Sequence, residues 1–197
     1  MSLIPAFELG LWNAWIFMLY VVFLNIFPYV LSGWLNDKEV LRKLGTDMPL
    51  NKSEKRISNI ISFLVFALIA YSVFVPLKLG TVWFFAGFFI YLLGAIIMAM
   101  AILNLITAAV DKPVTTGVYR FSRNPGYLGL FLVYCGTGIA CISWVFLLFT
   151  AVFMLLLHIS VVSEERFCLQ KYGDAYQEYM DKTPRWIGIP RSNKKPT

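Results

Sequence analysis

Two groups of polar residues flank one long uncharged stretch of the chain. Arg123, Asn124 and Tyr127 stand where the stretch begins, and Glu164 and Glu165 stand where it ends. A guanidinium can bind a carboxylate as a bidentate fork, and carboxylates accept hydrogen bonds from amines and hydroxyls. If the chain folds back between the two groups, they meet at one boundary of the membrane and form a candidate ligand site. The alternative is an ion pair that only anchors the fold.

The elements that must position these groups are membrane helices. Of 197 residues, 59% are hydrophobic and 14% are charged, whereas soluble domains carry about 25% charged residues. Each of four uncharged stretches is long enough to cross a bilayer. They comprise residues 9–36, 57–77, 79–110 and 126–163.

The last stretch is too long for a single crossing. Its 38 residues would reach about 57 Å as one helix, against a hydrocarbon core of about 30 Å. We therefore expect a helical hairpin that reverses near Gly136, Gly138 and residues 141–143, because small residues allow a turn and close helix approach. The expected fold is all-α, a polytopic membrane protein with five transmembrane helices and a C-terminal helical segment.

The distribution of basic residues predicts the orientation. With five spans, sixteen of the 17 Lys and Arg residues fall on one side, in segments 36–56, 111–125 and 164–197, and Lys78 falls on the other. Basic residues accumulate on the cytoplasmic side. We expect the amino terminus outside and the carboxyl terminus in the cytoplasm. The net charge of +6 fits contact with membrane lipids and needs no nucleic-acid partner.

The chain is expected to form a single membrane-embedded domain, residues 1–197. Its three cysteines, Cys135, Cys141 and Cys168, have neither paired spacing nor a matching histidine cluster, so we expect no metal site. Other chemistry has to come from the polar groups that flank the hairpin.

Several tyrosines near the end of the hairpin bear on the site. Tyr172, Tyr176 and Tyr179 follow Glu165 at spacings of seven, four and three, which places them on one face if a helix continues through Gly173.

His158 stands seven residues before Glu165. This places it on about the same helix face, where it could line an acceptor tunnel. A buried histidine that bonds to a neighbouring helix is the favoured interpretation.

Two motifs, in this order and spacing, resemble a known superfamily. The first motif reads Tyr119-x-x-x-Arg123-Asn124-Pro125-x-Tyr127-x-Gly129. The second reads Glu164-Glu165-x-x-x-Leu169-x-x-Tyr172-Gly173-x-x-Tyr176-x-x-Tyr179. Together they are similar to the isoprenylcysteine carboxyl methyltransferase and phospholipid methyltransferase superfamily of integral-membrane enzymes. The resemblance covers about residues 111–190.

The resemblance implies methyl transfer from S-adenosylmethionine to a lipid-like acceptor at the cytoplasmic face. It assigns catalytic roles to Arg123 and Glu165. The cofactor-binding residues that it implies are Tyr119, Arg123, Asn124, Pro125, Tyr127, Glu164, Glu165, Tyr176, Tyr179 and Arg185. Methyl transfer from a sulfonium requires positioning and exclusion of water rather than a metal.

One position departs from part of the superfamily. Many carboxyl methyltransferases have histidine where this chain has Asn124, so the acceptor stays open between an isoprenylcysteine-type carboxylate and a phospholipid amine. An amine would need a base, for which Glu165 is a candidate.

Two other functions remain possible from the sequence. Sterol-type membrane reductases that use NADPH carry a similar Arg-x-Pro-x-Tyr-x-Gly turn and a Cys-x-x-Lys-Tyr-Gly ending, here residues 168–173. The short chain and the paired glutamates favour the methyltransferase. The third possibility is a membrane scaffold without catalysis.

Overall fold

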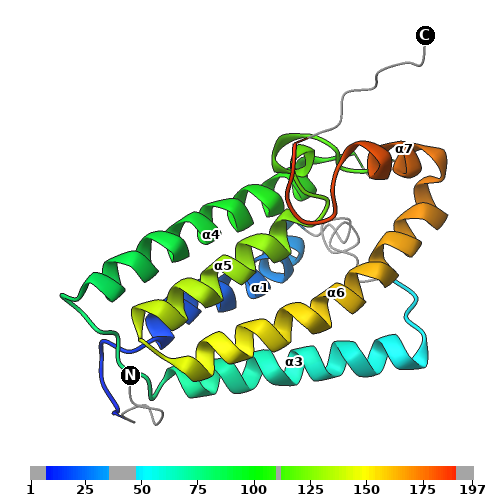
Figure 1. Cartoon of the computed structure of the whole chain (residues 1–197). Coiled ribbons are helices and arrows are strands. Elements are labelled where there is room, and N and C mark those ends of the chain that lie inside the picture. Colours follow the sequence, from blue (N-terminus) through cyan, green and yellow to red (C-terminus); the bar gives the residue numbers. More distant parts are fainter. Residues whose placement is uncertain (1–7, 36–47, 110–111, 190–197) are drawn as a thin grey trace.

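The computed structural model describes residues 8–35, 48–109 and 112–189, which form helices and connecting loops without a β-strand (Figure 1). The expected all-α fold is thus confirmed for the described residues. In order, the elements are α1 (Trp15–Leu35), α3 (Lys52–Ser72), α4 (Val82–Thr107), the short 3-10 helix η1 (Gly117–Arg120), α5 (Pro125–Ala140), α6 (Trp144–Tyr172) and α7 (Asp174–Lys182).

Four helices, α1, α3, α4 and α6, are long and apolar enough to cross a membrane. Helix α5 is apolar but has only 16 residues. Its crossing, and with it the five-span topology and the orientation of the termini, stays a prediction. Much of the basic loop before α3 and the end of the basic tail lie outside the described residues.

Helices α4 and α5 are held together by direct contact between their backbones. A Cβ atom added at Gly87 would lie 2.4 Å from the carbonyl oxygen of Gly136, and one at Gly94 would lie 2.6 Å from that of Gly129. The two glycines on each helix are seven residues apart, so they recur on one face. Small residues of this kind allow membrane helices to approach closely. This interface fixes the position of α5.

The chain reverses between α5 and α6 within residues 141–143. The backbone N–H of Ser143 donates to the carbonyl of Gly138 (2.9 Å), and the Ser143 hydroxyl accepts from the N–H of Phe146 (3.4 Å) at the start of α6. Helix α6 then runs back beside α5 (Figure 1). Because α6 has 29 residues and α5 only 16, the last turns of α6 extend past the first residue of α5.

The helix that carries the glutamates ends at Gly173. This residue has φ 53° and ψ −131°, a conformation that glycine adopts easily, and α7 starts at the next residue. The helix therefore does not continue through Gly173, which was the condition for placing Tyr176 and Tyr179 on one face with Glu165. Tyr176 and Tyr179 instead lie on α7, where both are buried and their rings stand 5.7 Å apart.

The amino-terminal end of α3 is joined to α6 by a single carboxylate. Glu54 completes a capping box with Asn51 at the start of α3. The same side chain accepts hydrogen bonds from the Ser163 hydroxyl and from the Arg166 guanidinium, both at 2.7 Å. This contact joins the start of α3 to α6 next to the paired glutamates.

Candidate active site

The two polar groups that flank the hairpin meet in the structure. Arg123, two residues before α5, places Nη2 3.4 Å from Oε1 of Glu165. Both side chains are deeply buried, with 9% and 5% of their surface exposed. The overhang of α6 explains the contact, because it brings Glu165 level with the loop that precedes α5. The proximity expected from the sequence is confirmed.

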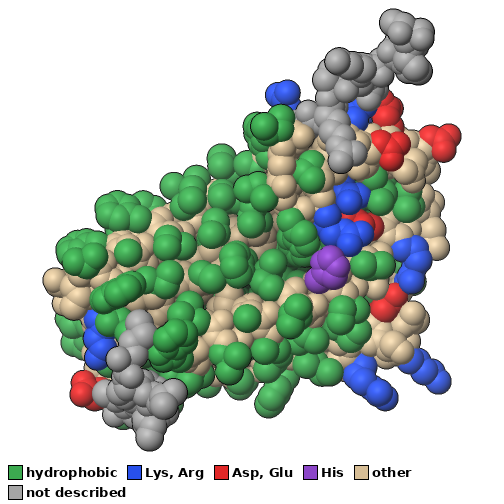
Figure 2. Space-filling view, in the orientation of Figure 1, with side chains coloured by type: hydrophobic (Ala, Val, Ile, Leu, Met, Phe, Trp, Pro, Cys, Tyr) green, Lys and Arg blue, Asp and Glu red, His purple; other side chains and the backbone are tan. Residues whose placement is uncertain are grey.

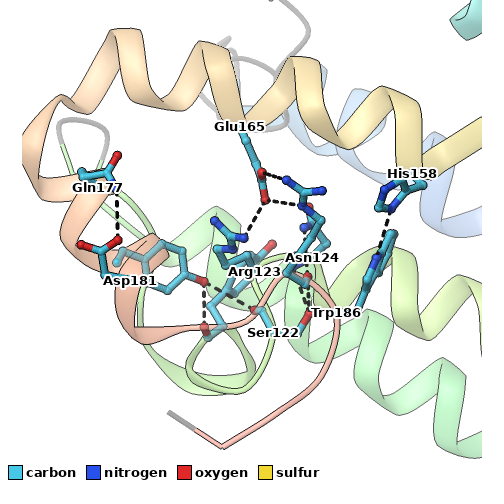
Figure 3. Close-up of polar contacts among 11 residues, drawn as sticks. Ser122, Arg123, Asn124, His158, Glu165, Gln177, Asp181 and Trp186 are labelled. Carbon is cyan, nitrogen blue, oxygen red and sulfur yellow. Dashed lines mark hydrogen bonds and ion pairs between the residues drawn. The ribbon is translucent and has the colours of Figure 1, made fainter. Parts of the chain in front are cut away.

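A second arginine, in the segment after α7, binds the same carboxylate. Arg185 donates to Glu165 through Nε (3.1 Å to Oε1) and Nη2 (2.7 Å to Oε2), the bidentate geometry of a strong arginine–carboxylate pair (Figure 3). This hydrogen bond raises the pKa of Arg185 above its usual value. Glu165 therefore lies between two guanidinium groups.

Arg123 keeps unused hydrogen-bonding capacity. Its Nε and Nη1 atoms are buried and have no hydrogen-bond partner within the described part of the chain. Leaving buried donors unsatisfied costs about 1–3 kcal/mol each, and more for charged groups. The same residue lines a cavity, so its guanidinium lies beside a space that a ligand could fill.

Glu164 faces a different partner. The hydroxyl of Tyr127, on the first turn of α5, donates to its Oε1 at 2.5 Å. Adjacent glutamates on α6 thus bind the beginning of α5 and the loop before it. This pair of contacts explains why both carboxylates can lie at the end of an apolar helix.

The loop that carries Arg123 is anchored at several points. Gly117 has φ 62°, and a Cβ atom there would lie 2.1 Å from Oδ1 of Asn104 on α4. That oxygen instead accepts the backbone N–H of Val118 (3.2 Å). At the other end of η1, the Tyr179 hydroxyl donates to the carbonyl of Tyr119 (2.7 Å). Asn104 therefore acts here as a structural contact for the loop.

Three tyrosines at this end stay neutral at physiological pH. Burial, strengthened by the negative charge of Glu164, raises the pKa of Tyr119 to about 12. Burial likewise raises the pKa of Tyr176 and of Tyr179 above the usual range of tyrosine. They offer hydroxyl donors and aromatic faces, on which a cation or a flat ring can pack.

These side chains surround a cavity of about 410 Å³, within the range of about 300–1,000 Å³ typical of small-molecule sites. One wall is polar. The other comes mainly from α4, where Met98, Ala101, Ile102 and Leu105 follow helical spacing and face the cavity. On the face seen in Figure 2, hydrophobic side chains cover the middle of the molecule and most charged ones gather near α7.

Eight of the ten residues expected to bind a cofactor line this cavity. They are Tyr119, Arg123, Asn124, Tyr127, Glu164, Glu165, Tyr176 and Tyr179. The other two are absent from its walls. Pro125 is buried at the first position of α5, where proline fits without losing a hydrogen bond, and Arg185 contacts the site through Glu165.

Sequence reasoning missed two parts of the site. The apolar wall carries the spacing 98, 101, 102, 105, but α4 is apolar on every face, so periodicity could not single it out. In the segment after α7 only Arg185 was expected, through the resemblance, and the backbone contacts of that segment were missed. Ser122 and Asn124 both donate to the carbonyl of Arg185 (3.3 and 3.1 Å), a backbone contact that leaves no pattern in the sequence.

The expectation for His158 is wrong. This side chain is exposed on α6, and its Nδ1 accepts a hydrogen bond from the indole N–H of Trp186 (3.4 Å), which belongs to a loop and not to a neighbouring helix. The described lining of the cavity does not include it.

The described residues thus define a helical membrane protein whose cavity has one polar wall and one apolar wall. Two comparisons with known proteins bear on the class of this protein. Residues 99–175 match the family model described as "Phospholipid methyltransferase". The chain is also similar to "Protein-S-isoprenylcysteine O-methyltransferase" of Schizosaccharomyces pombe, with 35% identity over 78 residues, which is 39% of this chain and 32% of that protein.

The aligned region spans about a third of that relative's length. The match to the family model contains both motifs up to the start of α7 and, of the apolar wall of α4, Ala101, Ile102 and Leu105. These findings confirm the resemblance to the membrane methyltransferase superfamily.

Proposed function

We propose that this chain binds S-adenosylmethionine in the cavity and transfers its methyl group to a lipophilic acceptor. The observation that carries the proposal is the buried guanidinium of Arg123, whose Nε and Nη1 atoms lack partners among the described residues and whose side chain lines the cavity. A ligand carboxylate could satisfy one of these donors, because Nε and Nη1 point to different sides of the guanidinium. S-adenosylmethionine has such a carboxylate, together with an amine, two ribose hydroxyls, a sulfonium and an adenine ring.

The remaining polar wall fits the other groups of this cofactor. Glu164 and Glu165 provide carboxylates for its amine and ribose hydroxyls. Tyr119, Tyr127 and Tyr176 provide aromatic faces for the sulfonium or the adenine. When bound, the cofactor supplies a methyl carbon on a positively charged sulfur, and the bond from carbon to the acceptor forms as the bond from carbon to sulfur breaks.

The chain's own contribution is to bind, orient and exclude water. The apolar wall of α4 suits the hydrocarbon part of a lipid-like acceptor, which would bring its nucleophile to the polar wall. Both carboxylate oxygens of Glu165 already accept hydrogen bonds from Arg185, so this residue would have to give up a contact to serve as a base. A carboxylate acceptor needs no base, and an amine acceptor does.

The distribution of basic residues supports a cytoplasmic location for this site. Loop residues 112–124 and α7, which surround the polar wall, belong to the two basic segments assigned to the cytoplasm from the sequence. S-adenosylmethionine would therefore enter from the cytoplasm, and the acceptor from the membrane.

The first test is calorimetric titration of detergent-solubilised protein with S-adenosylmethionine and, separately, with NADPH. We expect binding of the first and none of the second. Arg123→Ala should weaken binding at least tenfold, because it removes a charged hydrogen-bond partner. The matched control is Arg166→Ala, since Arg166 also lies on this end of the molecule but pairs with Glu54 outside the cavity.

Other results would favour the alternatives. Binding of NADPH alone would indicate a reductase, and binding of neither would indicate a scaffold. The acceptor can then be identified by incubation with labelled S-adenosylmethionine, using a prenylated cysteine and an aminophospholipid as separate substrates. Labelling of neither, despite cofactor binding, would contradict the proposed acceptor classes.

A further inference from the structure

The segment after α7 lies across the polar end of the molecule and is here named the strap, residues 183–189. It pairs with the loop before α5 through two backbone hydrogen bonds. The N–H of Arg123 donates to the carbonyl of Pro184 (3.0 Å), and the N–H of Gly188 donates to the carbonyl of Phe121 (3.1 Å). The strap therefore holds the backbone of the residue whose guanidinium lines the cavity.

Two consecutive strap residues also contact α6. Arg185 forms its fork on Glu165, and Trp186 reaches His158, about two helical turns earlier (Figure 3). The indole and imidazole rings are stacked, with centroids 6.0 Å apart and planes inclined by 27°. Because the two contacts lie about two turns apart along α6, they fix both the position and the direction of the strap.

The contact between Trp186 and His158 lies outside the cavity. His158 is visible at the surface in Figure 2, next to the charged side chains of the polar end, and the described lining of the cavity contains neither ring. As it is placed, this pair does not border the described cavity. Its effect on the site has to pass through the neighbouring Arg185.

We propose that Trp186 and His158 are positioning residues that latch the strap on α6 and so set how Glu165 is shared between two arginines. This inference rests on the proposed function, because it concerns how the site is kept ready for the carboxylate of S-adenosylmethionine. With the latch closed, Arg185 takes both oxygens of Glu165 and leaves Arg123 only a longer contact of 3.4 Å.

Opening the latch changes how the two arginines share the carboxylate of Glu165. Without the fork of Arg185, the Glu165 carboxylate is free to form a closer pair with Arg123, whose donors are then no longer available to a ligand. The carboxylate of the cofactor would have to compete with Glu165. The latch thus raises affinity for the cofactor without touching it, and leaves the acceptor and the transferred methyl group unaffected.

Four variants separate the components of the latch. Trp186→Ala and His158→Ala remove both the stacking and the hydrogen bond, whereas Trp186→Phe and His158→Phe keep a ring and lose the bond. Because His158 is exposed, its replacement carries little risk for folding. Trp144→Ala and Leu148→Ala are matched controls, since both residues are exposed on the first turns of α6, at least ten residues before His158.

The measurements are hydrogen exchange of the strap amides, Gly188 above all, and the KM and kcat for S-adenosylmethionine. Both alanine variants should speed exchange at Gly188 about tenfold and raise KM by a similar factor, with kcat within about twofold of the wild type. The phenylalanine variants should recover at least part of both losses. The controls should match the wild type.

Each contrary result has a distinct meaning. Unchanged KM in both alanine variants, or a fall in kcat without a change in KM, would overturn the latch while leaving the proposed function intact. Equal effects in Trp144→Ala would overturn it too, because the loss would then be general. If the wild type binds no S-adenosylmethionine, the proposed function fails and this inference fails with it.

Discussion

The interface between α4 and α5 and the polar end beneath the strap are built in opposite ways. At the interface, glycines bring two backbones together, and the carbonyl of Gly136 lies where a side chain of Gly87 would have to be. At the polar end, long side chains bridge separate elements, as Arg185 does to reach Glu165, and a cavity of about 410 Å³ remains between them. One region excludes every extra atom, and the other leaves room for a ligand.

The comparison shows how a site can keep buried donors without partners. Arg123 lies only two residues before α5, so the packing of α5 on α4 helps to fix the position of its backbone. Because that packing does not involve the polar end, the unsatisfied donors there need not hold the fold together. The stability of one region thus permits the unfavourable arrangement of the other.

The largest effect should follow from breaking the packed region. In Gly136→Leu the new Cβ would lie 2.4 Å from the backbone nitrogen of Tyr91 and 2.6 Å from the carbonyl oxygen of Gly87. Backbone atoms cannot move aside as a flexible side chain can, so the helices must separate. We expect the free energy of unfolding to fall by more than about 4 kcal/mol, measured by thermal or denaturant unfolding in detergent.

The control is a glycine on a helix without such a neighbour. Among the described residues, Gly33 on α1 has no atom from outside its own helix within 4 Å of an added Cβ, so Gly33→Ala should be neutral or slightly stabilising through its better helix propensity. If Gly136→Leu unfolded like the wild type, the two helices would not be in backbone contact.

A smaller effect is expected at the polar end, where the two partners of one ion pair are not equivalent. Glu165→Gln leaves the buried Arg123 without its carboxylate, which should cost about 3 kcal/mol of unfolding free energy. Arg123→Ala leaves Glu165 paired with Arg185, so it should cost only about 1 kcal/mol. Both should abolish binding of S-adenosylmethionine.

This asymmetry can be checked by unfolding and calorimetry on the same samples. A loss of stability that is equal in the two variants would show that Arg185 does not support Glu165. Arg166→Ala removes an exposed partner of Glu54 and should cost less than about 1 kcal/mol with unchanged binding, because its pair is open to solvent.

The membrane character and helical fold could be predicted from the sequence because long uncharged stretches have few alternatives in a bilayer. The meeting of Arg123 with Glu165 followed from a hairpin that was inferred from the length of the last uncharged stretch, its small residues and the distribution of basic residues. Whether the helix continues through Gly173 stayed open in the sequence, since a single glycine is tolerated inside many helices, and the structure ends α6 there.

The part of the site made by the strap could not be predicted from a pattern. Arg185 was expected at the site only through the resemblance, and its contact with Glu165 joins residues from separate elements. Trp186 meets His158 because the strap crosses α6, and a lone histidine in an apolar stretch does not indicate which loop will cover it. Apolar periodicity predicts faces of helices and says nothing of irregular segments that lie on them.

The smallest effect on stability is expected from a buried phenol at the polar end, that of Tyr119. Burial and the charge of Glu164 raise the pKa of Tyr119 to about 12 from the ordinary value of 10.0. In the unfolded chain this phenol loses its proton first as the pH rises. Its contribution to stability is therefore complete below about pH 10 and is lost as the pH rises through 12.

Tyr119→Phe keeps the ring but removes this titration, so the variant should lose less stability than the wild type between pH 10 and pH 12. The difference should reach at most about 2 kcal/mol, because one pKa unit corresponds to about 1.4 kcal/mol. Unfolding in detergent at stepped pH measures it, with Gly33→Ala as a control that should follow the wild-type curve. Parallel curves for Tyr119→Phe and the wild type would mean that the phenol is exposed to water, and that the polar end is less enclosed than the packing of α7 over η1 requires.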